Sequence, residues 1–255
     1  MDVWGPWLWY ANMAALACLL ARFAVTGLYR IYKFLFTYFL VVIGGSLVLT
    51  QTRFGSHSYT FTYMGVEAVM HLLAILAVLE MYGIALAKHP GLAGFGRAGL
   101  LAAALLAIAI AAVGVPLDRD VPSGQLPILQ RFLTLERSLD VIIVVFLMLI
   151  ALFITWFPIE LSRNTSLVIG GSLVFYLTRG AGLLLVNLSP AHLPAINDVL
   201  LSISASLIAI WAAVLRSEKV SEDAVTGHFW DPAAMERLTR QLDAINAALV
   251  RFVRQ

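Results

Sequence analysis

Long apolar runs alternate with short polar connections along most of the chain. Each run is close to the about 20 residues that an α-helix needs to cross the hydrocarbon core of a bilayer. Seven spans are expected: Pro6–Leu28, Lys33–Gln51, Phe61–Ala87, Arg97–Pro116, Arg131–Phe157, Thr165–Asn187 and Asn197–Leu215. We therefore predict an all-α, polytopic membrane protein whose seven-transmembrane-helix bundle occupies residues 1–216.

The composition supports this class of fold. Of the 255 residues, 61% are hydrophobic and 13% are charged, whereas a soluble domain carries about a quarter charged residues. The mean hydropathy is +0.89. A formal net charge of +2 does not indicate nucleic-acid binding. The single cysteine, Cys18, falls inside a predicted span, which excludes an internal disulfide framework and a cysteine-rich metal motif.

Lysine and arginine are distributed unequally between the two sets of connections. Most lie after the first, third and fifth spans and in the C-terminal segment, including Arg30, Lys33, Lys88, Arg97, Arg163 and Arg216. Because positively charged short loops stay in the cytoplasm, we expect the N-terminus outside and the C-terminus in the cytoplasm, in a bacterial inner membrane. Aromatic residues before Ala11 predict an interfacial belt, not a signal peptide.

Residues 217–255 have a different character, a polar linker followed by a helix. Asp231 is a suitable N-cap, with Pro232 at the first helical position. Spacings of three and four then place apolar residues in a narrow heptad seam. The seam comprises Met235 and five predicted partner-binding residues, Leu238, Leu242, Ile245, Leu249 and Phe252. This cytoplasmic amphipathic helix either lies on the membrane or, as its narrow seam favours, packs on its own bundle, a second copy or a partner protein.

Ionisable residues occur inside the predicted spans. Glu136, Arg137 and Asp140 open the fifth span, and Glu136 and Asp140 share a helix face because they are four residues apart. Glu67 and His71 have the same spacing in the third span. Counting about 1.5 Å per residue from the outer boundary places Glu67 level with Glu136.

The same count places Arg179 of the sixth span level with His71 and Asp140. Charges at this depth are costly unless they face the bundle interior and find partners. We therefore predict a ligand-binding pocket between the third, fifth and sixth spans, open to the outer side. Its residues are Glu67, His71, Glu136, Arg137, Asp140 and Arg179, with Asn12, Tyr63, Tyr176, Asn197, Asp198 and Ser202 at the rim.

An alternative interpretation is structural: the ions neutralise one another and fix the register of the helices. In both cases an unpaired arginine in the hydrocarbon would cost several kcal/mol. We expect Arg179 to pair with Asp140, and either Glu67 or Glu136 to neutralise Arg137.

Two further features concern helix packing. Arg22 and Glu80 lie at matching depth near the inner side, which predicts a structural ion pair between the first and third spans, unless Arg22 extends to the interface. The sixth span holds small residues expected to allow close helix contact, namely Gly170, Gly171, Gly180 and Gly182.

Several known kinds of site do not fit the sequence. The seventh span holds no lysine for a retinal Schiff base, and His71 is the one histidine well inside a span, so paired haem ligation lacks ligands. Zinc-protease, hydrolase and Walker motifs are missing. The sequence thus predicts no catalytic residue, no metal ligand and no cofactor.

Short motifs carry one resemblance. Glu-Arg-Ser-Leu at 136–139, the seven-span layout and Trp-Asp-Pro at 230–232 resemble a group of uncharacterised bacterial seven-helix integral membrane proteins, and this implies no activity. The layout is also similar to bacterial seven-helix sensory modules, although no kinase, cyclase or phosphodiesterase sequence follows in the chain.

Three functions remain open at this stage. The leading one is a receptor-like or accessory protein that binds a small polar or amphiphilic ligand in the outer pocket and signals through the C-terminal helix. The second is a small-solute or proton-coupled transporter in which Glu67, His71 and Asp140 titrate. The third is a structural subunit of a larger membrane complex. An enzyme is less expected than any of these, because no nucleophile lies beside a base.

Overall fold

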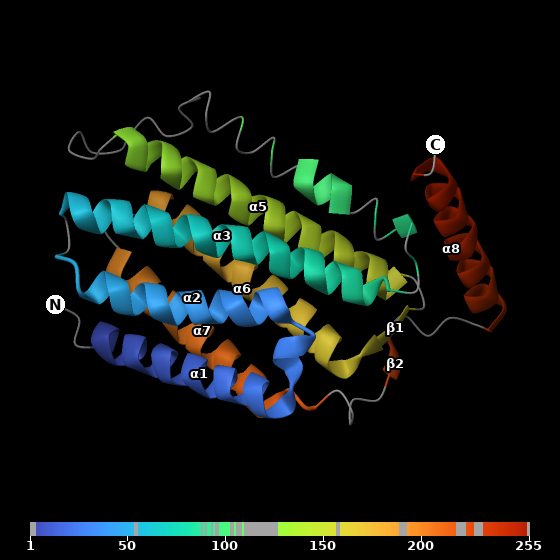
Figure 1. Cartoon of the computed structure of the whole chain (residues 1–255), viewed down its shortest axis with the longest axis horizontal. Helices are drawn as coiled ribbons and strands as arrows, with labels where there is room; N and C mark the ends of the chain where they lie inside the picture. The colour runs from blue at the N-terminus through green and yellow to red at the C-terminus, as the bar shows by residue number, and fades with distance from the viewer. Residues whose placement is uncertain are drawn as a thin grey trace.

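The computed structural model describes residues 4–53, 56–87, 127–156, 159–188, 193–217, 223–226 and 232–253, with a few positions between 89 and 109. The long helices of the bundle run side by side (Figure 1). They are α1 (Trp4–Thr26), α2 (Lys33–Thr50), α3 (His57–Ala85), α5 (Pro127–Trp156), α6 (Arg163–Leu188) and α7 (Leu193–Val214). The predicted all-α fold is confirmed.

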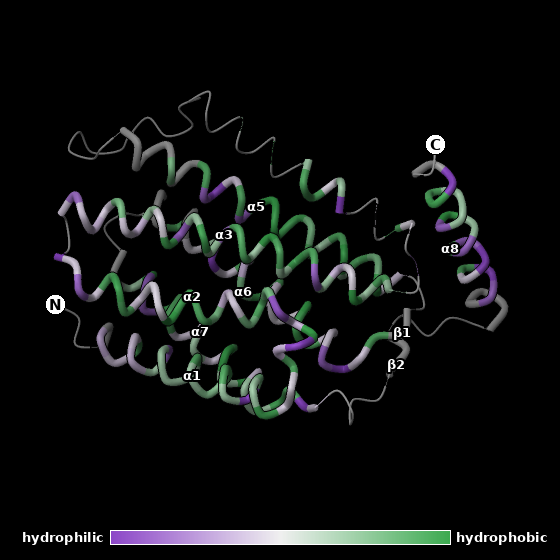
Figure 2. Tube along the Cα trace, viewed as in Figure 1, coloured by the Kyte–Doolittle hydropathy of each residue, from purple (hydrophilic) through white to green (hydrophobic). Residues whose placement is uncertain are grey.

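Five helices in the described part are long and apolar enough to cross a membrane by length and composition. These stretches are Pro6–Thr26, Lys33–Thr50, His57–Ala85, Leu135–Trp156 and Ala195–Val214. Apolar colouring extends along these helices in Figure 2. The predicted fourth span, Arg97–Pro116, lies mostly outside the described residues, and α6, which contains the predicted sixth span, is not among the five. The count of seven spans therefore stays a prediction.

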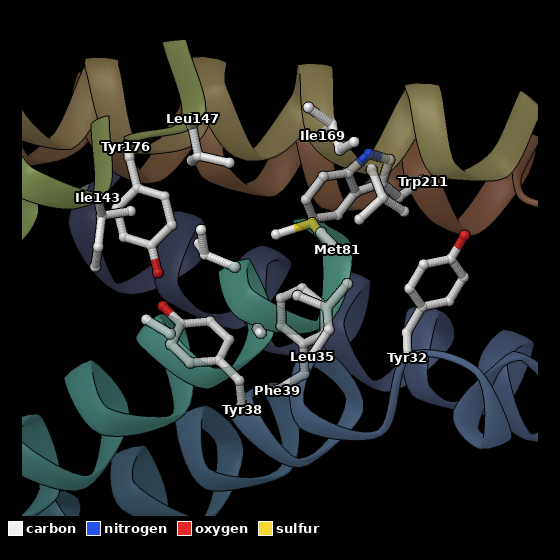
Figure 3. Packing of buried hydrophobic residues seen from close by; sticks show 14 of the residues in the cluster. Tyr32, Leu35, Tyr38, Phe39, Met81, Ile143, Leu147, Ile169, Tyr176 and Trp211 are labelled. Atoms are coloured by element: carbon white, nitrogen blue, oxygen red, sulfur yellow. The ribbon is translucent and has the colours of Figure 1, made fainter. Parts of the chain in front are cut away.

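The six helices close into a ring in chain order. Each of them packs on the next one along the described chain, and α7 returns to pack on α1. The interior holds large apolar side chains such as Phe23, Phe39, Leu147 and Trp211. Figure 3 shows Trp211 and Met81 meeting in this core. Because the ring brings α3, α5 and α6 together, it also brings together their ionisable residues.

Two of the four glycines of α6 lie at close helix contacts. A Cβ on Gly171 would meet the indole of Trp211 at 2.5 Å, and one on Gly182 would meet Leu200 at 2.5 Å. Both neighbours belong to α7. Gly170 and Gly180 have nothing within 4 Å of such a Cβ. The packing role is therefore confirmed for Gly171 and Gly182.

Helix boundaries depart from the sequence prediction where local caps act. The third span was expected to begin at Phe61, but α3 begins at His57. The hydroxyl of Ser56 accepts a hydrogen bond of 3.0 Å from the amide of Tyr59, which satisfies an amide that would otherwise lack a partner. After α1 the chain turns at Gly27, whose φ of 77° is in the left-handed region that favours glycine.

The predicted ion pair between Arg22 and Glu80 is wrong. Arg22 Nε donates to the carbonyl oxygen of Leu215 at 2.9 Å, at the end of α7. The carboxylate of Glu80 accepts from the backbone amides of Lys33 at 2.8 Å and Phe34 at 3.1 Å. Each side chain thus satisfies the end of a neighbouring helix, and an acid at a helix N-terminus also interacts favourably with the helix dipole.

A short sheet joins two segments that were expected to be loop or linker. Strand β1 (Ile159–Ser162) pairs antiparallel with β2 (Asp223–Thr226). Nearby, Asn164 donates to the carbonyl of Arg216 at 2.7 Å and accepts from its amide at 3.2 Å. The segment leaving α7 is therefore attached to the start of α6 and to β1.

The C-terminal helix, α8 (Pro232–Val253), lies at an angle to the bundle (Figure 1). Leu242 is buried, Leu238 and Leu249 are half-buried, and Ile245 is exposed. The side chain of Phe252 lies outside the described residues. Part of the predicted seam is therefore covered by this chain itself.

Candidate functional site

Arg179 of α6 is at the centre of an ion-pair network. Its Nε lies 3.0 Å from Asp140 Oδ2, which confirms the predicted pair. Its Nη2 lies 2.5 Å from Glu136 Oε1 and 3.2 Å from Glu67 Oε2. Two of these acids come from α5 and one from α3, so a single guanidinium joins three helices.

His71 extends the network by one residue. Its Nε2 lies 3.2 Å from Asp140 Oδ1, and its Nδ1 lies 2.9 Å from the backbone carbonyl oxygen of Glu67. A neutral imidazole has one N–H, whereas both of its nitrogens here face oxygen acceptors. The geometry therefore favours an additional proton, held by His71 as an imidazolium or by Asp140 as a carboxylic acid.

Tyrosines surround the network. The hydroxyl of Tyr63 donates to Glu136 Oε2 at 3.4 Å. The phenol oxygens of Tyr38 and Tyr176 point toward one another in Figure 3, and both residues line the space beside Asp140. Tyr63 and Tyr176 were predicted near the site; Tyr38 was not, because the hydroxyl of a tyrosine within an apolar span carries no charge to mark it.

The space between α3, α5 and α6 is closed. It is bounded by Glu67, His71, Asp140, Arg179 and their neighbours, and it has no room for a water molecule. The predicted pocket between the third, fifth and sixth spans is therefore corrected: the ions fill that space with their own contacts.

A cavity lies on the other side of Arg179, between α5, α6 and α7. Its volume is about 260 Å³. The lining residues are Glu136, Phe175, Thr178, Arg179, Asn197, Leu200, Leu201, Ile203 and Ser204. Glu136 and Arg179 thus belong both to the closed network and to the wall of an open cavity.

The polar residues of α7 contribute unequally. Asn197, predicted at the rim, lines the cavity, and so does Ser204, which was missed. The hydroxyl of Ser204 donates to the side-chain oxygen of buried Asn12 at 3.3 Å. Asn12, which was predicted at the rim, therefore contacts a lining residue but does not line the cavity itself. The hydroxyl of Ser202 instead donates to the backbone carbonyl of Asp198 at 2.7 Å. The four-residue spacing of polar residues on α7 shows which side of the helix is polar. It does not show which of these residues faces the cavity.

Both glutamates predicted as partners for Arg137 contact Arg179. Arg137 itself is half-buried on α5, and its neutralisation by either glutamate stays a prediction. Ligand atoms of Glu67, His71 and Glu136 lie within 4.8 Å of one another, as in a metal site. However, the two carboxylates already bind the guanidinium, so a metal ion would have to displace Arg179.

A second and larger groove runs along α5. It has a volume of about 850 Å³ and is lined by apolar residues, among them Tyr82, Leu100, Val145, Phe146 and Trp156. Its described lining has no charged side chain, so it offers less specificity than the cavity beside Arg179.

Comparison with known proteins adds no assignment: no family model, no curated protein and no solved structure matches this chain. The geometry of the site therefore carries the functional argument.

Proposed function

We propose that this chain is a receptor-like or accessory membrane protein that binds a small amphiphilic molecule in the cavity between α5, α6 and α7. The observation that carries the proposal is a cavity of about 260 Å³ with buried Glu136 and half-buried Arg179 at one end. Binding sites for small molecules are concave, mostly apolar and supplied with a few convergent polar groups. Charged groups inside membrane spans more often mark functional positions than neutral ones do.

The closed network supports this function by fixing the cavity wall. Arg179 joins α3, α5 and α6, so the position of α6 depends on its three acidic partners. A ligand that contacts Glu136 would compete with Arg179 for that carboxylate. Ligand binding would thereby change the contacts that hold α6 beside α5 and α7.

In this proposal, the change caused by ligand binding passes from α7 to the C-terminal segment at the inner end of α7. Leu215 and Arg216 are held there by Arg22 of α1 and Asn164 of α6. The following segment forms β2 and then leads to α8. In this proposal α8 is a cytoplasmic amphipathic helix that transmits the bound state to a second copy or a membrane partner.

The proposal includes seven spans with the N-terminus outside, in a bacterial inner membrane. Single cysteines introduced after Gln255 and into the tail before Pro6, in a Cys18→Ser background, test the orientation with a membrane-impermeant maleimide. The C-terminal cysteine should react only after the membrane is permeabilised. Reaction in intact cells would contradict the orientation.

Filling the cavity tests ligand binding. Leu201→Trp places an indole on the cavity wall, whereas Ile210→Trp places one on the same helix at a side chain that is 53% exposed. A panel of small amphiphiles should contain compounds that raise the melting temperature of the wild type and of Ile210→Trp, but not of Leu201→Trp. If no compound acts, or if Leu201→Trp responds like the control, the cavity is not a binding site.

Proton-coupled transport is the second candidate, and the ring of His71 favours it. Both nitrogens of this ring face acceptors beside Asp140, which is a suitable arrangement for holding a proton that is released later. Proteoliposomes loaded with a pH-sensitive dye should then acidify when substrate is added, and His71→Gln should abolish the signal. Absence of any substrate-dependent proton flux excludes this function. Co-purification of a stoichiometric partner would instead indicate a structural subunit.

A further inference from the structure

The ion-pair network beside the cavity is balanced in charge. Its three carboxylates belong to Glu67, Glu136 and Asp140. Arg179 supplies one positive charge, and Arg137, which follows Glu136 on α5 and makes interactions of its own, supplies a second. The additional proton held by His71 or Asp140 supplies a third. The network therefore has no surplus charge for a ligand ion to neutralise.

A charged ligand would be poorly accommodated in this cavity. Glu136, the one acid in the described lining, is buried, and its two oxygens are held by Arg179 Nη2 and by the hydroxyl of Tyr63. A cation would have to displace one of these partners. An anion would lie beside the same carboxylate and compete with three acids for Arg179. Because a charge without a partner is costly in a low-dielectric interior, an uncharged ligand is favoured.

Arg179 is the more accessible of the two charged groups in the cavity wall. Its side chain is 23% exposed, against 4% for Glu136. Its contacts with the three acids use Nε and Nη2, and within the described part of the chain Nη1 makes no hydrogen bond. A guanidinium has five N–H donors and no acceptor. Nη1 therefore offers its N–H groups to an acceptor oxygen that enters the cavity.

The other polar groups of the described lining are weaker donors. The hydroxyls of Thr178 and Ser204 already donate within the protein, at 2.8 Å and 3.3 Å. Asn197 is exposed and its amide is uncharged. A hydrogen bond from a charged donor is roughly twice as strong as one between neutral groups, so Arg179 is the donor that selects the ligand. Its Nε–Nη2 edge, a fork that could take both oxygens of a carboxylate, is occupied by the acids, which leaves Nη1 for a single oxygen.

We propose that the ligand of this cavity is a small uncharged carbonyl compound with an apolar body, whose oxygen accepts a hydrogen bond from Arg179 Nη1. This inference rests on the proposed function and specifies its ligand class. The remaining lining is apolar, mainly Phe175, Leu200, Leu201 and Ile203, which suits a carbon skeleton. The volume of about 260 Å³ is below the range of about 300–1,000 Å³ for drug-sized ligands. A single aromatic ring with a short acyl arm is the size class that fits.

Four probes of similar size separate the oxygen from charge and shape. Acetophenone carries the carbonyl, and α-methylstyrene has a CH₂ group in place of its oxygen. Both are radiolabelled and measured by equilibrium dialysis against the full chain in nanodiscs, with empty nanodiscs giving the lipid concentration to which the affinities refer. Wild type should bind acetophenone at least tenfold more tightly. A tenfold difference corresponds to about 1.4 kcal/mol, the lower end of what a hydrogen bond to a charged group contributes. Unlabelled benzoate and benzylammonium should displace acetophenone at least tenfold less effectively than unlabelled acetophenone does.

Magic-angle-spinning NMR on the unaltered sequence identifies the donor. The carbonyl carbon of ¹³C-labelled acetophenone is dephased by ¹⁵N nuclei that lie close to it. Protein labelled with ¹⁵N in its arginine guanidinium groups should dephase this carbon, because Arg179 is the one arginine in the described lining. Protein labelled in its asparagine side-chain amides should dephase it less. Leu201→Trp should abolish the arginine signal, and Ile210→Trp, at the exposed position on the same helix, should keep it.

The outcomes distinguish this inference from the proposed function. If α-methylstyrene binds as tightly as acetophenone, and Leu201→Trp abolishes the binding of both, the cavity is a binding site but no carbonyl contact selects its ligand. If benzoate or benzylammonium displaces acetophenone as well as acetophenone itself does, the uncharged class is wrong. If the asparagine label dephases the carbonyl more strongly than the arginine label, Arg179 is not the donor. If acetophenone does not bind, the carbonyl class is wrong, and the wider amphiphile panel decides on the cavity itself.

Discussion

Replacing Arg179 by methionine should destabilise the bundle more than removing any one of its acidic partners. Arg179 contacts three carboxylates at 2.5–3.2 Å. At an effective dielectric constant of about 20, two unit charges about 3 Å apart attract by about 5 kcal/mol before desolvation is counted. Removing one member of a buried pair typically costs about 3–5 kcal/mol in free energy of unfolding. The loss of all three contacts places Arg179→Met at or above about 5 kcal/mol.

Asp140→Asn should be milder. Arg179 keeps Glu67 and Glu136 as partners in that variant, so the expected loss is about 1–3 kcal/mol, in the range for an imperfectly replaced charged hydrogen bond. Combining Arg179→Met with Glu67→Gln and Glu136→Gln should restore more of the free energy of unfolding lost in Arg179→Met than any smaller combination of these substitutions. That triple variant leaves Asp140 with His71 alone, which is a neutral pair when the imidazole is protonated.

The free energy of unfolding can be measured by adding SDS to the protein in mixed micelles and following tryptophan fluorescence. Arg163→Met serves as a control, because it removes an exposed arginine from the first position of the same helix. The reasoning is refuted if Arg179→Met is no less stable than Asp140→Asn. It is equally refuted if the triple variant is no more stable than Arg179→Met.

Three further predictions concern helix contacts. Gly171→Ala should lower the free energy of unfolding by about 1–3 kcal/mol, because its Cβ meets an indole of α7, whereas Gly170→Ala should be neutral or slightly stabilising in the same SDS titration. Glu80→Ala should lower the free energy of unfolding by about 1–2 kcal/mol, because the first amides of α2 lose their side-chain acceptor, and hydrogen exchange should increase at these amides. Gly91→Val should displace α8, whose backbone would lie 2.6 Å from the new Cβ; limited proteolysis should then cut α8 faster than in Gly94→Val, whose Cβ meets nothing within 4 Å.

Depth along the spans was sufficient to predict the members of the network. Glu67 with His71, and Glu136 with Asp140, are spaced four apart, and the residue count placed Arg179 at the same height. The structure brings these five residues together. The success follows from two fixed quantities, the rise of an α-helix and its periodicity.

The direction in which a side chain points around the bundle could not be predicted from depth. Arg22 and Glu80 are level, but α3 packs on α2 and α5 in the ring while α1 packs on α2 and α7. Glu80 therefore reaches the start of α2, and Arg22 reaches the end of α7. The cavity was misplaced for the same reason: Glu136 and Arg179 were assigned to the correct height but to the wrong side of α6.

The pairing of β1 with β2 could not be predicted from the sequence either. Each strand has four residues, and the two are paired across more than sixty residues of sequence, with Ile159 opposite Thr226. Alternation over four residues is too short to distinguish a strand from a loop. The contact between Gly91 and Asn246 Oδ1, at 2.8 Å, is likewise a tertiary contact that no local pattern marks.

Because Glu136 and Arg179 belong to both the network and the cavity wall, stability and ligand binding should be linked. A ligand that binds the folded state raises its stability in proportion to its affinity. Arg179→Met removes a charged group from the cavity wall and the contacts that hold α6 beside α5, so a ligand of the cavity should stabilise this variant less than wild type. The amphiphiles that raise the melting temperature of wild type should therefore raise that of Arg179→Met by fewer degrees. An equal or larger rise in Arg179→Met would contradict a link between the network and ligand binding.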